Sequence, residues 1–256
     1  MNKEDCMLIQ YASDLHFEFR SNREYLKSHP IIPNGEILLL AGDITPFAEI
    51  NKHKDAINTL SDHFEAVYWV PGNHEYYGSD ITKKPTPLFE KIRSNVFLVN
   101  NQQIQYKGVN LVFSTLWSSI SPHNELQVQQ SVTDFHIILA GQEKFAPAHF
   151  NALHRESLAF LQSAAKTENT IVVTHHVPTL LNYPPTYKNS PLTEAFAVEL
   201  IDFIEQSGID HWVYGHHHTN TPPFKIGNTQ LLTNQLGYVD YNEHKAFQHN
   251  VCIDIN

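Results

Sequence analysis

Short apolar runs rich in β-branched and aromatic residues recur along the chain, and a residue that can bind a metal follows each of them closely. The runs cover residues 8–11, 37–41, 67–70, 171–173 and 212–214. Their length and composition are typical of strands that are buried on both faces of a parallel sheet. The polar residues after them are therefore expected at the carboxyl ends of strands, the edge where open α/β sheets bind their ligands.

Helical periodicity separates several of these runs. Apolar positions in residues 48–64 recur at near-helical spacing and predict an amphipathic crossover helix between two strands. Further helices are predicted over residues 87–94, 147–166 and 194–206. Thr193 is a plausible N-cap of the last one, and residues 20–30 are read as a loop or a short helix. The β-α-β alternation predicts an α/β fold.

The rest of the chain is read as short strands and long loops. Strands are predicted at residues 96–99, 109–114 and 251–255, and Gly227-Asn228 is read as a hairpin turn. Residues 118–147 are the least regular stretch, expected to cover the site, with Asp134-Phe135-His136 as a supporting element. Residues 177–191 contain four prolines and are expected to form an ordered extended loop. Without repeats or linkers, a single domain over residues 1–256 is expected.

Composition and charge narrow the class of protein. The 256 residues carry a formal charge of -10 without a lysine or arginine run, which argues against stable nucleic acid binding. No apolar stretch reaches the roughly 20 residues that cross a bilayer, and no signal peptide is recognisable, so a cytoplasmic protein without membrane contact is expected. Cys6 and Cys252 are too few for a disulfide framework or a cysteine zinc site and leave one terminal pairing open. The oligomeric state stays open.

The residues after the strands supply carboxylates, an amide and imidazoles. Asp14 and His16 are two positions apart, so they can face the same side of an extended chain, and His216 and His218 share this spacing. The set is completed by Asp43, Asn73 and His175. Carboxylate and imidazole together suit divalent transition metals such as Mn, Fe, Zn or Co rather than calcium.

The order of these residues resembles the calcineurin-like metallophosphoesterase superfamily. Its pattern runs Asp-x-His, Gly-Asp, Gly-Asn-His-(Asp/Glu), His and Gly-His-x-His. The matching blocks here are Asp14-Leu15-His16, Gly42-Asp43, Gly72-Asn73-His74-Glu75, His175 and Gly215-His216-His217-His218. One block alone would be weak evidence, but five in order, each after a strand-like run, are specific. The resemblance implies a two-sheet α/β sandwich flanked by helices.

The resemblance also implies a role for each residue. One divalent transition-metal ion would be held by Asp14, His16, Asp43 and His218. A second would be held by Asp43, Asn73, His175 and His216, so Asp43 would bridge the two. Two ions about 3.5–4 Å apart lower the pKa of a shared water, which makes a metal-bridging hydroxide the expected nucleophile. His74 would act as a general acid or stabilise the transition state, with Glu75 orienting its loop.

Several of these residues also have ordinary structural interpretations. An isolated Asp14 or Asp43 would be read as a turn residue, and only the complete set favours metal binding. His176 and His217 adjoin expected ligands and should point away from them, toward supporting, surface or substrate-contacting positions. Tyr183 and Tyr187 either contact the substrate or pack in the core.

The expected activity is hydrolysis of a small-molecule phosphoric ester. Ser/Thr protein phosphatases of the superfamily have arginines beside the Gly-Asp and Gly-Asn-His-Glu blocks, and both are absent around Asp43 and Asn73. A dianionic monoester would lose a bidentate clamp that matches its charge, so the prediction leans to phosphodiesters or nucleotide-like substrates. The alternatives are a phosphomonoesterase, protein phosphatases included, a DNA exonuclease, which would need a basic groove, and a non-catalytic metal-binding interaction module. The presence of His74 counts against the last.

Overall fold

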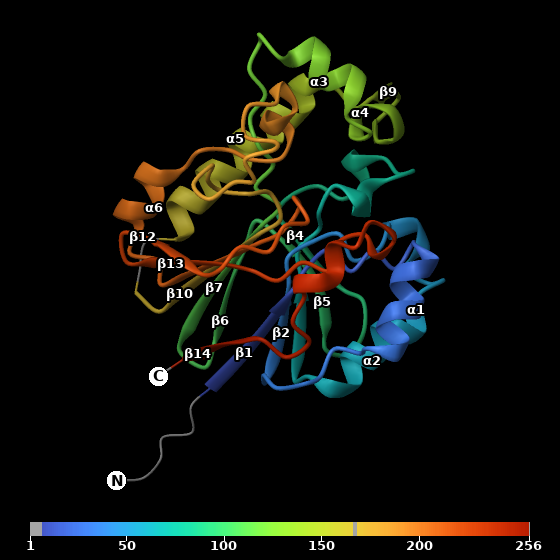
Figure 1. Ribbon diagram of the computed structural model, residues 1–256, viewed down its shortest axis with the longest axis vertical. Helices are drawn as coiled ribbons and strands as arrows, with labels where there is room; N and C mark the ends of the chain where they lie inside the picture. The colour runs from blue at the N-terminus through green and yellow to red at the C-terminus, as the bar shows by residue number, and fades with distance from the viewer. Residues whose placement is uncertain (1–6, 166–167, 256) are drawn as a thin grey trace.

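The continuous apolar runs of the sequence become the central strands of two six-stranded sheets that pack face to face (Figure 1). The computed structural model describes residues 7–165 and 168–255. The first sheet has the strand order β14-β1-β2-β3-β5-β4, and the second has the order β12-β13-β11-β10-β7-β6. With helices on the outer faces of both sheets, the expected two-sheet α/β sandwich is confirmed.

In the first sheet the four central strands are parallel and each edge strand is antiparallel to its neighbour. The strands are β1 Met7–Ala12, β2 Ile37–Leu40, β3 Ala66–Trp69, β4 Leu88–Lys91, β5 Val96–Asn100 and β14 Cys252–Ile255. Every residue of β2 is buried, because a central strand is covered on both faces.

The second sheet repeats this plan, with four parallel central strands and two antiparallel edges. Its strands are β6 Gln102–Tyr106, β7 Val109–Ser114, β10 Thr170–Thr174, β11 His211–Tyr214, β12 Phe224–Ile226 and β13 Thr229–Thr233. The antiparallel pairing of β12 with β13 confirms the hairpin predicted at Gly227-Asn228.

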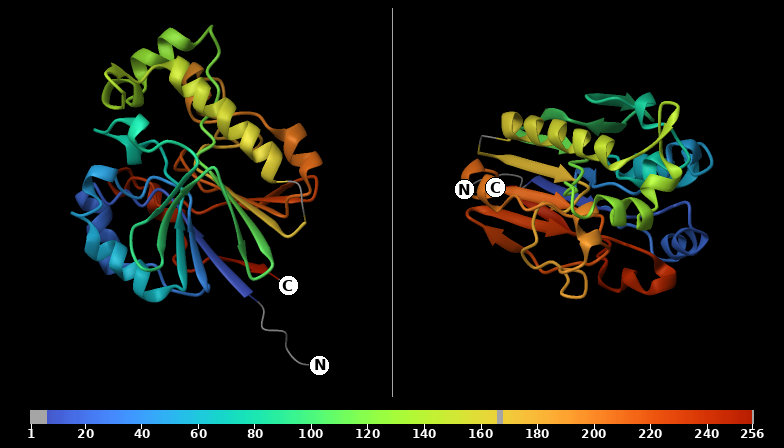
Figure 2. Two further views of the ribbon diagram at one scale, coloured as in Figure 1. Left: turned by 180° about the vertical axis from the view of Figure 1, so that it is seen from behind. Right: turned by 90° about the horizontal axis from the view of Figure 1, so that it is seen from above.

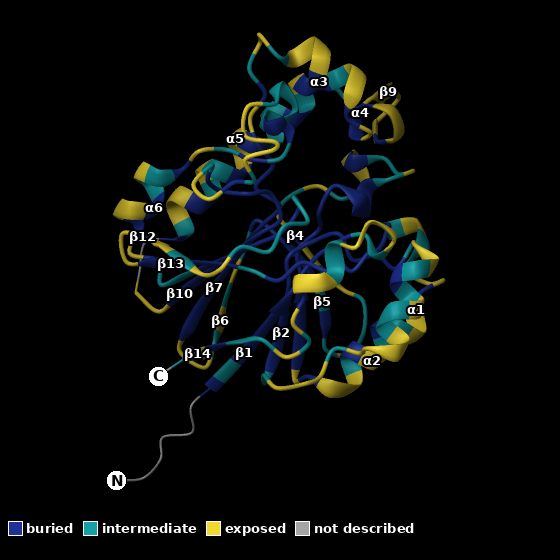
Figure 3. Ribbon diagram, viewed as in Figure 1, coloured by how far each residue is buried: buried dark blue, intermediate teal, exposed yellow. Residues whose placement is uncertain are grey.

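Three apolar layers hold the sandwich together. The central layer lies between the sheets and includes Ile9, Leu39 and Val173. Helices α1 Arg20–Ser28 and α2 Lys54–His63 cover the outer face of the first sheet. Helices α5 Pro147–Ala164 and α6 Ile201–Ser207 cover the outer face of the second, as Figure 2 shows from two further directions. Figure 3 shows that burial concentrates in the strands and in the helix faces that contact them.

A fourth apolar cluster lies above the carboxyl ends of the strands, around the buried Trp117. The elements in this region are α3 Glu125–Ser131, α4 Asp134–Ile137, β8 Leu139–Ala140, β9 Glu143–Lys144 and the first turn of α5. Short 3-10 helices complete the chain, namely η1 Phe47–Glu49, η2 His74–Tyr76, η3 Ile81–Lys83, η4 Pro191–Ala195, η5 Val239–Tyr241 and η6 Glu243–Ala246. Residues 118–147 are thus more regular than the sequence indicated.

Two predicted helices are wrong. Residues 87–94 contain strand β4, because pairing with β5 as an antiparallel edge outweighs the local pattern. Residues 194–206 do not form one helix: η4 ends at Ala195, a parallel bridge joins Ala197 to Val177, and α6 begins only at Ile201. The cap is also different. Ser190 accepts the hydrogen bond from the Leu192 N–H, so it caps η4 in place of Thr193.

Other elements predicted from the sequence are present in the structure. The long helix predicted from residue 147 is α5, and the final strand is β14. The crossover helix is shorter than predicted, because η1 precedes α2. The pairing left open for Cys6 and the helical end predicted at Lys166 lie outside the described residues. Within the described part of the chain, none of the helices combines the length and apolar character needed to span a bilayer.

Candidate metal centre

The five sequence blocks meet at one edge of the sandwich, where the central strands of both sheets end. Hydrogen bonds join neighbouring blocks: the Asp14 N–H donates to the Gly42 carbonyl at 2.9 Å, and the Gly215 N–H donates to the His175 carbonyl at 3.0 Å. A parallel bridge between Ser13 and Gln235 joins the two sheets at this edge. Residues that are up to about two hundred positions apart in the sequence are thereby brought side by side, as parallel strand ends require.

Four of the predicted ligands form one group, Asp14, His16, Asp43 and His218, whose donor atoms all lie within 4.8 Å of one another. The Nε2 atoms of His16 and His218 are 3.0 Å apart. His218 Nε2 also lies 3.3 Å from Asp14 Oδ1. These are the four residues that the resemblance assigns to the first ion.

A second group adjoins the first and shares Asp43 with it. Donor atoms of Asp43, His175 and His216 lie within 4.8 Å of one another. His175 Nε2 is 2.9 Å from His216 Nδ1 and 3.4 Å from Asp43 Oδ2. Asn73 belongs to the same place, because its Oδ1 lies 3.1 Å from His175 Nε2. All seven predicted ligands are thus brought together, in the two sets expected.

The geometry and chemistry of these side chains fit two cations. Two nitrogens bound about 2.0–2.1 Å from a common ion are separated by about 2.9 Å at a right angle and by about 3.3 Å at the tetrahedral angle usual for zinc. The Nε2 pair of the first group, at 3.0 Å, and the Nε2–Nδ1 pair of the second, at 2.9 Å, lie near the lower of these separations. Buried imidazoles and carboxylates are the donors that divalent transition metals prefer. In a third group, formed by His16, Glu18 and His74, the donor atoms also lie within 4.8 Å of one another.

The acidic residues of the centre attract positive charge. Burial opposes protonation of His175, but the charge and hydrogen bond of Asp43 outweigh it and raise the pKa of His175 to about 9. Burial likewise opposes protonation of His218, and hydrogen bonds to Asp14 and Glu243 raise its pKa to about 10. The same electrostatic field would favour a divalent cation between these side chains.

The backbone of the centre is held in a conformation that L-residues rarely adopt. Five of the seven predicted ligands have positive φ angles, at 55° for Asp14, 48° for His16, 55° for Asp43, 81° for His216 and 50° for His218. Each such residue costs on the order of 1–3 kcal/mol and persists only where its surroundings hold it. Hydrogen bonds provide that support, since the His16 N–H donates to the Asp43 carbonyl and the His216 N–H donates to Asp14 Oδ1.

Two glycines make room for the ligands. A Cβ atom at Gly72 would lie 2.2 Å from Asp43 Oδ1 and 2.7 Å from His175 Nε2. At Gly42, which has a φ of +90°, a Cβ atom would lie 2.2 Å from His175 Nδ1. The glycines of the Gly-Asp and Gly-Asn-His blocks are therefore required because another ligand occupies the space of their missing side chain.

Gly72→Ala is expected to remove most of the bound metal while the fold is retained. The backbone at Gly72 permits alanine, so the new methyl group acts by displacing Asp43 and His175. Gly78→Ala is the matched control, because its φ of +68° makes alanine strained, by about 1–2 kcal/mol, while nothing lies within 4 Å. Metal content and melting temperature should separate the two variants, with metal lost only at Gly72. Equal metal content in both would contradict the steric account.

Glu75 fixes the loops that carry Asp43 and Asn73. Its buried carboxylate accepts hydrogen bonds from the backbone N–H groups of Asp43 at 3.0 Å, Ile44 at 2.7 Å and Gly72 at 2.6 Å. The indole N–H of Trp69 donates to it as well, at 2.9 Å. Burial and the charge of Asp43 raise the pKa of Glu75 to about 8, against the effect of these donors. The geometry agrees with the orienting role expected from the sequence.

Two acidic residues at the centre were not predicted from the sequence. Glu18 Oε1 accepts hydrogen bonds from Nδ1 of His16 and Nδ1 of His74, both at 2.9 Å. Although burial opposes this, the two imidazoles lower the pKa of Glu18 to about 2. Glu243 accepts a hydrogen bond from His218 Nδ1 at 2.7 Å. Glu18 lies two residues after His16, just as His16 lies two residues after Asp14, and this spacing could have indicated that Glu18 faces the same site. Nothing in the sequence marks Glu243.

Tyr238 was also not predicted. Its ring lies 4.8 Å from that of His16 and 4.4 Å from that of His218, measured between ring centroids. Its hydroxyl is 3.3 Å from His74 Nε2. Tyr238 therefore closes one side of the centre and contacts His74 on the side opposite to Glu18.

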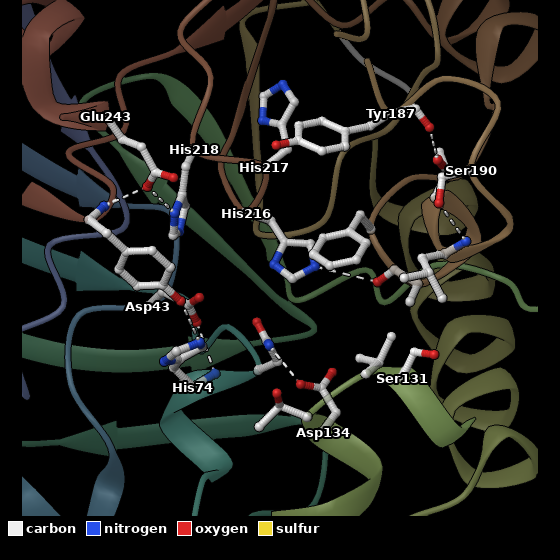
Figure 4. A pocket seen from close by; sticks show the side chains of 18 of the residues that line it. Asp43, His74, Ser131, Asp134, Tyr187, Ser190, His216, His217, His218 and Glu243 are labelled. Atoms are coloured by element: carbon white, nitrogen blue, oxygen red, sulfur yellow. Dashed lines mark hydrogen bonds and ion pairs between the residues drawn. The ribbon is translucent and has the colours of Figure 1, made fainter. Parts of the chain in front are cut away.

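A cavity of ≈ 400 Å³ opens above the second group (Figure 4). Asp43, Asn73, His74 and His216 are part of its lining. Its outer walls come from the segment around Ser131 to Asp134 and from the loop that carries Tyr183, Tyr187 and Ser190. Residues 118–147 and 177–191 thus cover the centre, as expected. None of the described residues that line this cavity is a lysine or an arginine.

Asp134 supports the centre through Asn73. Its buried Oδ1 accepts hydrogen bonds from Asn73 Nδ2 at 2.9 Å and from the Tyr77 hydroxyl at 2.8 Å. The amide nitrogen of Asn73 is thereby turned toward Asp134, which leaves its Oδ1 for the second group. Burial raises the pKa of Asp134 above its ordinary value.

The residues whose roles were left open divide into packing and cavity positions. His176 is buried outside the cavity lining, with its ring 5.2 Å from that of Trp117. The same ring lies 4.3 Å from that of His216, so the expectation that His176 points away from the predicted ligands is wrong. His217 lines the cavity and stacks on Tyr183, with ring centroids 5.5 Å apart. Tyr183 is itself buried in the apolar core, whereas Tyr187 is 54% exposed and stands at the cavity wall.

The sandwich, with its two adjoining groups of side chains that could hold metal ions, is that of a metal-dependent phosphoesterase. The chain belongs to the calcineurin-like phosphoesterase family, whose model matches residues 7–220. The uncharacterized protein L509 of Acanthamoeba polyphaga mimivirus is 31% identical over 280 aligned residues, which cover 97% of this chain and 97% of that protein.

Comparison with solved structures gives one likeness in fold and one weaker match. The phosphopantetheinyl hydrolase of Mycobacterium tuberculosis has a TM-score of 0.65 at 17% identity, over 98% of this chain and 96% of that one. A dimetal phosphatase from Danio rerio matches more weakly, with a TM-score of 0.41 at 11% identity over 90% of this chain and 87% of that one. At these identities the likeness concerns the fold.

Proposed function

We propose that the protein hydrolyses phosphoric esters at a dinuclear metal centre. The observation that carries this proposal is the pair of donor groups that share Asp43 beside a cavity. Asp14, His16, Asp43 and His218 would hold one divalent transition-metal ion. Asp43, Asn73, His175 and His216 would hold the other. The contributing residues extend from Asp14 to Glu243 and come from both sheets, which supports a single domain over residues 1–256.

The protein's own side chains would position the ester and move a proton. Two bound ions would lower the pKa of a shared water and neutralise the phosphoryl oxygens. His74 lines the cavity beside Asp43, with its Nδ1 held by Glu18. Its Nε2 is then the atom that can give a proton to the leaving oxygen.

The charge of the cavity favours diesters over monoesters. A monoester near neutral pH approaches two negative charges, and bidentate arginine contacts would match them. The described lining contains no lysine or arginine, and its carboxyl groups are those of Asp43, Asp134 and Glu243. A phosphodiester carries one negative charge, which two ions can neutralise without a guanidinium group. This supports phosphodiester or nucleotide-like substrates.

The outer walls suit the second alcohol group of a diester. They carry hydroxyls at Ser131, Ser190 and Tyr187 and an aromatic ring at Phe196. Phe196 is fixed against the metal centre, since its ring lies 4.7 Å from that of His216 at an interplanar angle of 24°. An aryl group or a base would find both stacking surfaces and hydrogen-bond partners there.

A comparison of matched aryl phosphate monoesters and diesters under saturating Mn tests this proposal. We expect kcat/KM to favour the diester. Tyr187→Ala should change the diester to monoester ratio while leaving the metal content as it is, because Tyr187 stands on the wall and outside both donor groups. Since one protein of this fold is a phosphopantetheinyl hydrolase, phosphopantetheinyl esters belong in the same panel.

The outcomes of this panel distinguish the alternatives. A preference for monoesters or for a phosphoprotein would overturn the diester proposal and leave the dinuclear centre intact. Metal binding without turnover on any ester would favour a non-catalytic interaction module. That module has no specific support here, because His74 is present and lines the cavity.

A further inference from the structure

A second cavity, of ≈ 580 Å³, lies on the outer face of the first sheet between α1 and α2. Figure 1 shows these two helices side by side, on the far side of the first sheet from the second sheet. The apolar part of the lining includes Phe17, Leu26, Ile31, Ala56, Leu60 and Phe64. Phe17, Leu60 and Phe64 are buried members of the core, so the base of the cavity is rigid. This volume is in the range of small-molecule sites, which are about 300–1,000 Å³.

Cationic side chains gather at the same cavity. Its lining includes Arg23, Lys27 and Lys52, whereas Asp55 is the single carboxylate among the described lining residues. The chain as a whole has a formal charge of -10, so a surface patch of average composition would be negative. The lining of this cavity has more cationic than acidic side chains. The cavity shares none of its described lining residues with the one above the metal centre.

The three cationic side chains of the cavity differ in their ion pairs and hydrogen bonds to the rest of the protein. Lys52 Nζ lies 3.0 Å from Glu49 Oε2, so its charge is already paired. Lys27 has no ion-pair partner within the described residues and is exposed. Arg23 is half-buried, and its Nη1 donates to the carbonyl oxygens of Phe17 and Glu18. These two hydrogen bonds hold the guanidinium group in place and leave its other N–H groups for a ligand.

We propose that this cavity is a ligand site for an amphipathic anion, with an apolar aromatic or aliphatic body and one acidic head group. The body would lie between α1 and α2 against Leu26, Ala56 and Leu60, where it displaces water from apolar surface. The acidic group would reach Arg23 and Lys27, which provide a planar fork and a flexible ammonium group. An apolar base alone would not select a charged ligand, and exposed cations alone would not bind one tightly. A cavity that combines an apolar base with cationic side chains can select a charged ligand and also bind it tightly.

The test compares two probes with nearly the same aromatic body. The fluorescent dye 8-anilinonaphthalene-1-sulfonate carries a sulfonate, and N-phenyl-1-naphthylamine carries no charge. We expect the metal-loaded protein to bind the sulfonate dye saturably with a stoichiometry of about one, as a single ligand cavity implies. Lys27→Glu should weaken this binding about tenfold, which corresponds to about 1.4 kcal/mol. It should change the affinity for the uncharged dye by no more than about twofold, because that dye has no charge for the side chain at position 27 to attract or repel.

Two further variants locate the site. Ala56→Trp places an indole in the cavity and should abolish binding of both dyes. Lys225→Glu is the matched charge control, since Lys225 is exposed on β12 of the other sheet and outside the cavity. It should change neither affinity. Inorganic phosphate, which is expected at the metal centre, should not displace the dye.

Several results would overturn the proposal. Unchanged dye binding in Ala56→Trp, equal weakening of both dyes by Lys27→Glu, or displacement by inorganic phosphate would place the dye elsewhere. Absence of saturable binding would show that the cavity does not take this class of ligand. If Ala56→Trp does not fold, the comparison of Lys27→Glu with Lys225→Glu still decides the question. None of these measurements uses turnover, so the result is independent of the proposed phosphoesterase activity.

Discussion

Replacing Asp43 by alanine is expected to remove both metal ions and the activity together. Asp43 is the residue shared by the two donor groups, and each group also loses a negative charge with it. Loss of a residue that merely supports a ligand already costs about 10–100-fold in metal affinity, so loss of a shared ligand should cost more. Metal analysis of the purified variant, together with turnover of an aryl phosphodiester, measures both effects.

Asp14→Ala and Asp62→Ala are the controls for this result. Asp14 belongs to the first group alone, so its alanine variant should lose one ion and keep the other. Asp62 is an exposed residue of α2, and its replacement should leave metal and activity unchanged. Full metal content in Asp43→Ala would remove the bridging role. Loss of both ions in Asp14→Ala would show that the two sites cannot be filled separately.

The central strands could be predicted because their burial leaves a local trace in the sequence. A strand covered on both faces, such as β2 with all of its residues buried, needs an unbroken apolar run. The elements that could not be predicted are those determined by distant partners. Strand β4 exists through its antiparallel pairing with β5, and the segment before α6 is extended because Ala197 pairs with Val177. Local periodicity contains no information on either partner.

The same distinction applies to the metal centre. The candidate ligands could be named because they follow strand ends and match the family's five blocks in order, and the glycines before two of them are required by close approach, as at Gly72. Asp134 was expected to support the site but its partner could not be named, and Glu243 could not be found, because each acts through a residue elsewhere in the chain. Glu243 contacts His218, and Asp134 contacts Asn73 from 61 positions away. Their placement depends on how the loops cover the sheet ends, which no local pattern determines.

His74→Ala is expected to retain both metal ions and to lose activity by on the order of 10²–10⁴-fold, the usual contribution of a proton-transfer group. The side chain of His74 belongs to neither of the groups that share Asp43. Its backbone N–H donates to Asp43 Oδ1 at 2.9 Å, and alanine keeps that hydrogen bond. Metal loss in this variant would instead favour the third group, in which His16, Glu18 and His74 can hold an ion.

The leaving group decides between the two roles of His74. Without bound metal, burial lowers the pKa of His74, but the charge of Asp43 and the hydrogen bond to Glu18 outweigh it and raise the pKa. An alkoxide leaving group needs a proton, whereas nitrophenolate needs little, so the defect of His74→Ala should shrink on nitrophenyl esters. Glu18→Gln should reproduce this dependence in weaker form, because Glu18 orients the imidazole through Nδ1. An equal loss on all leaving groups would mean that His74 stabilises developing charge and transfers no proton.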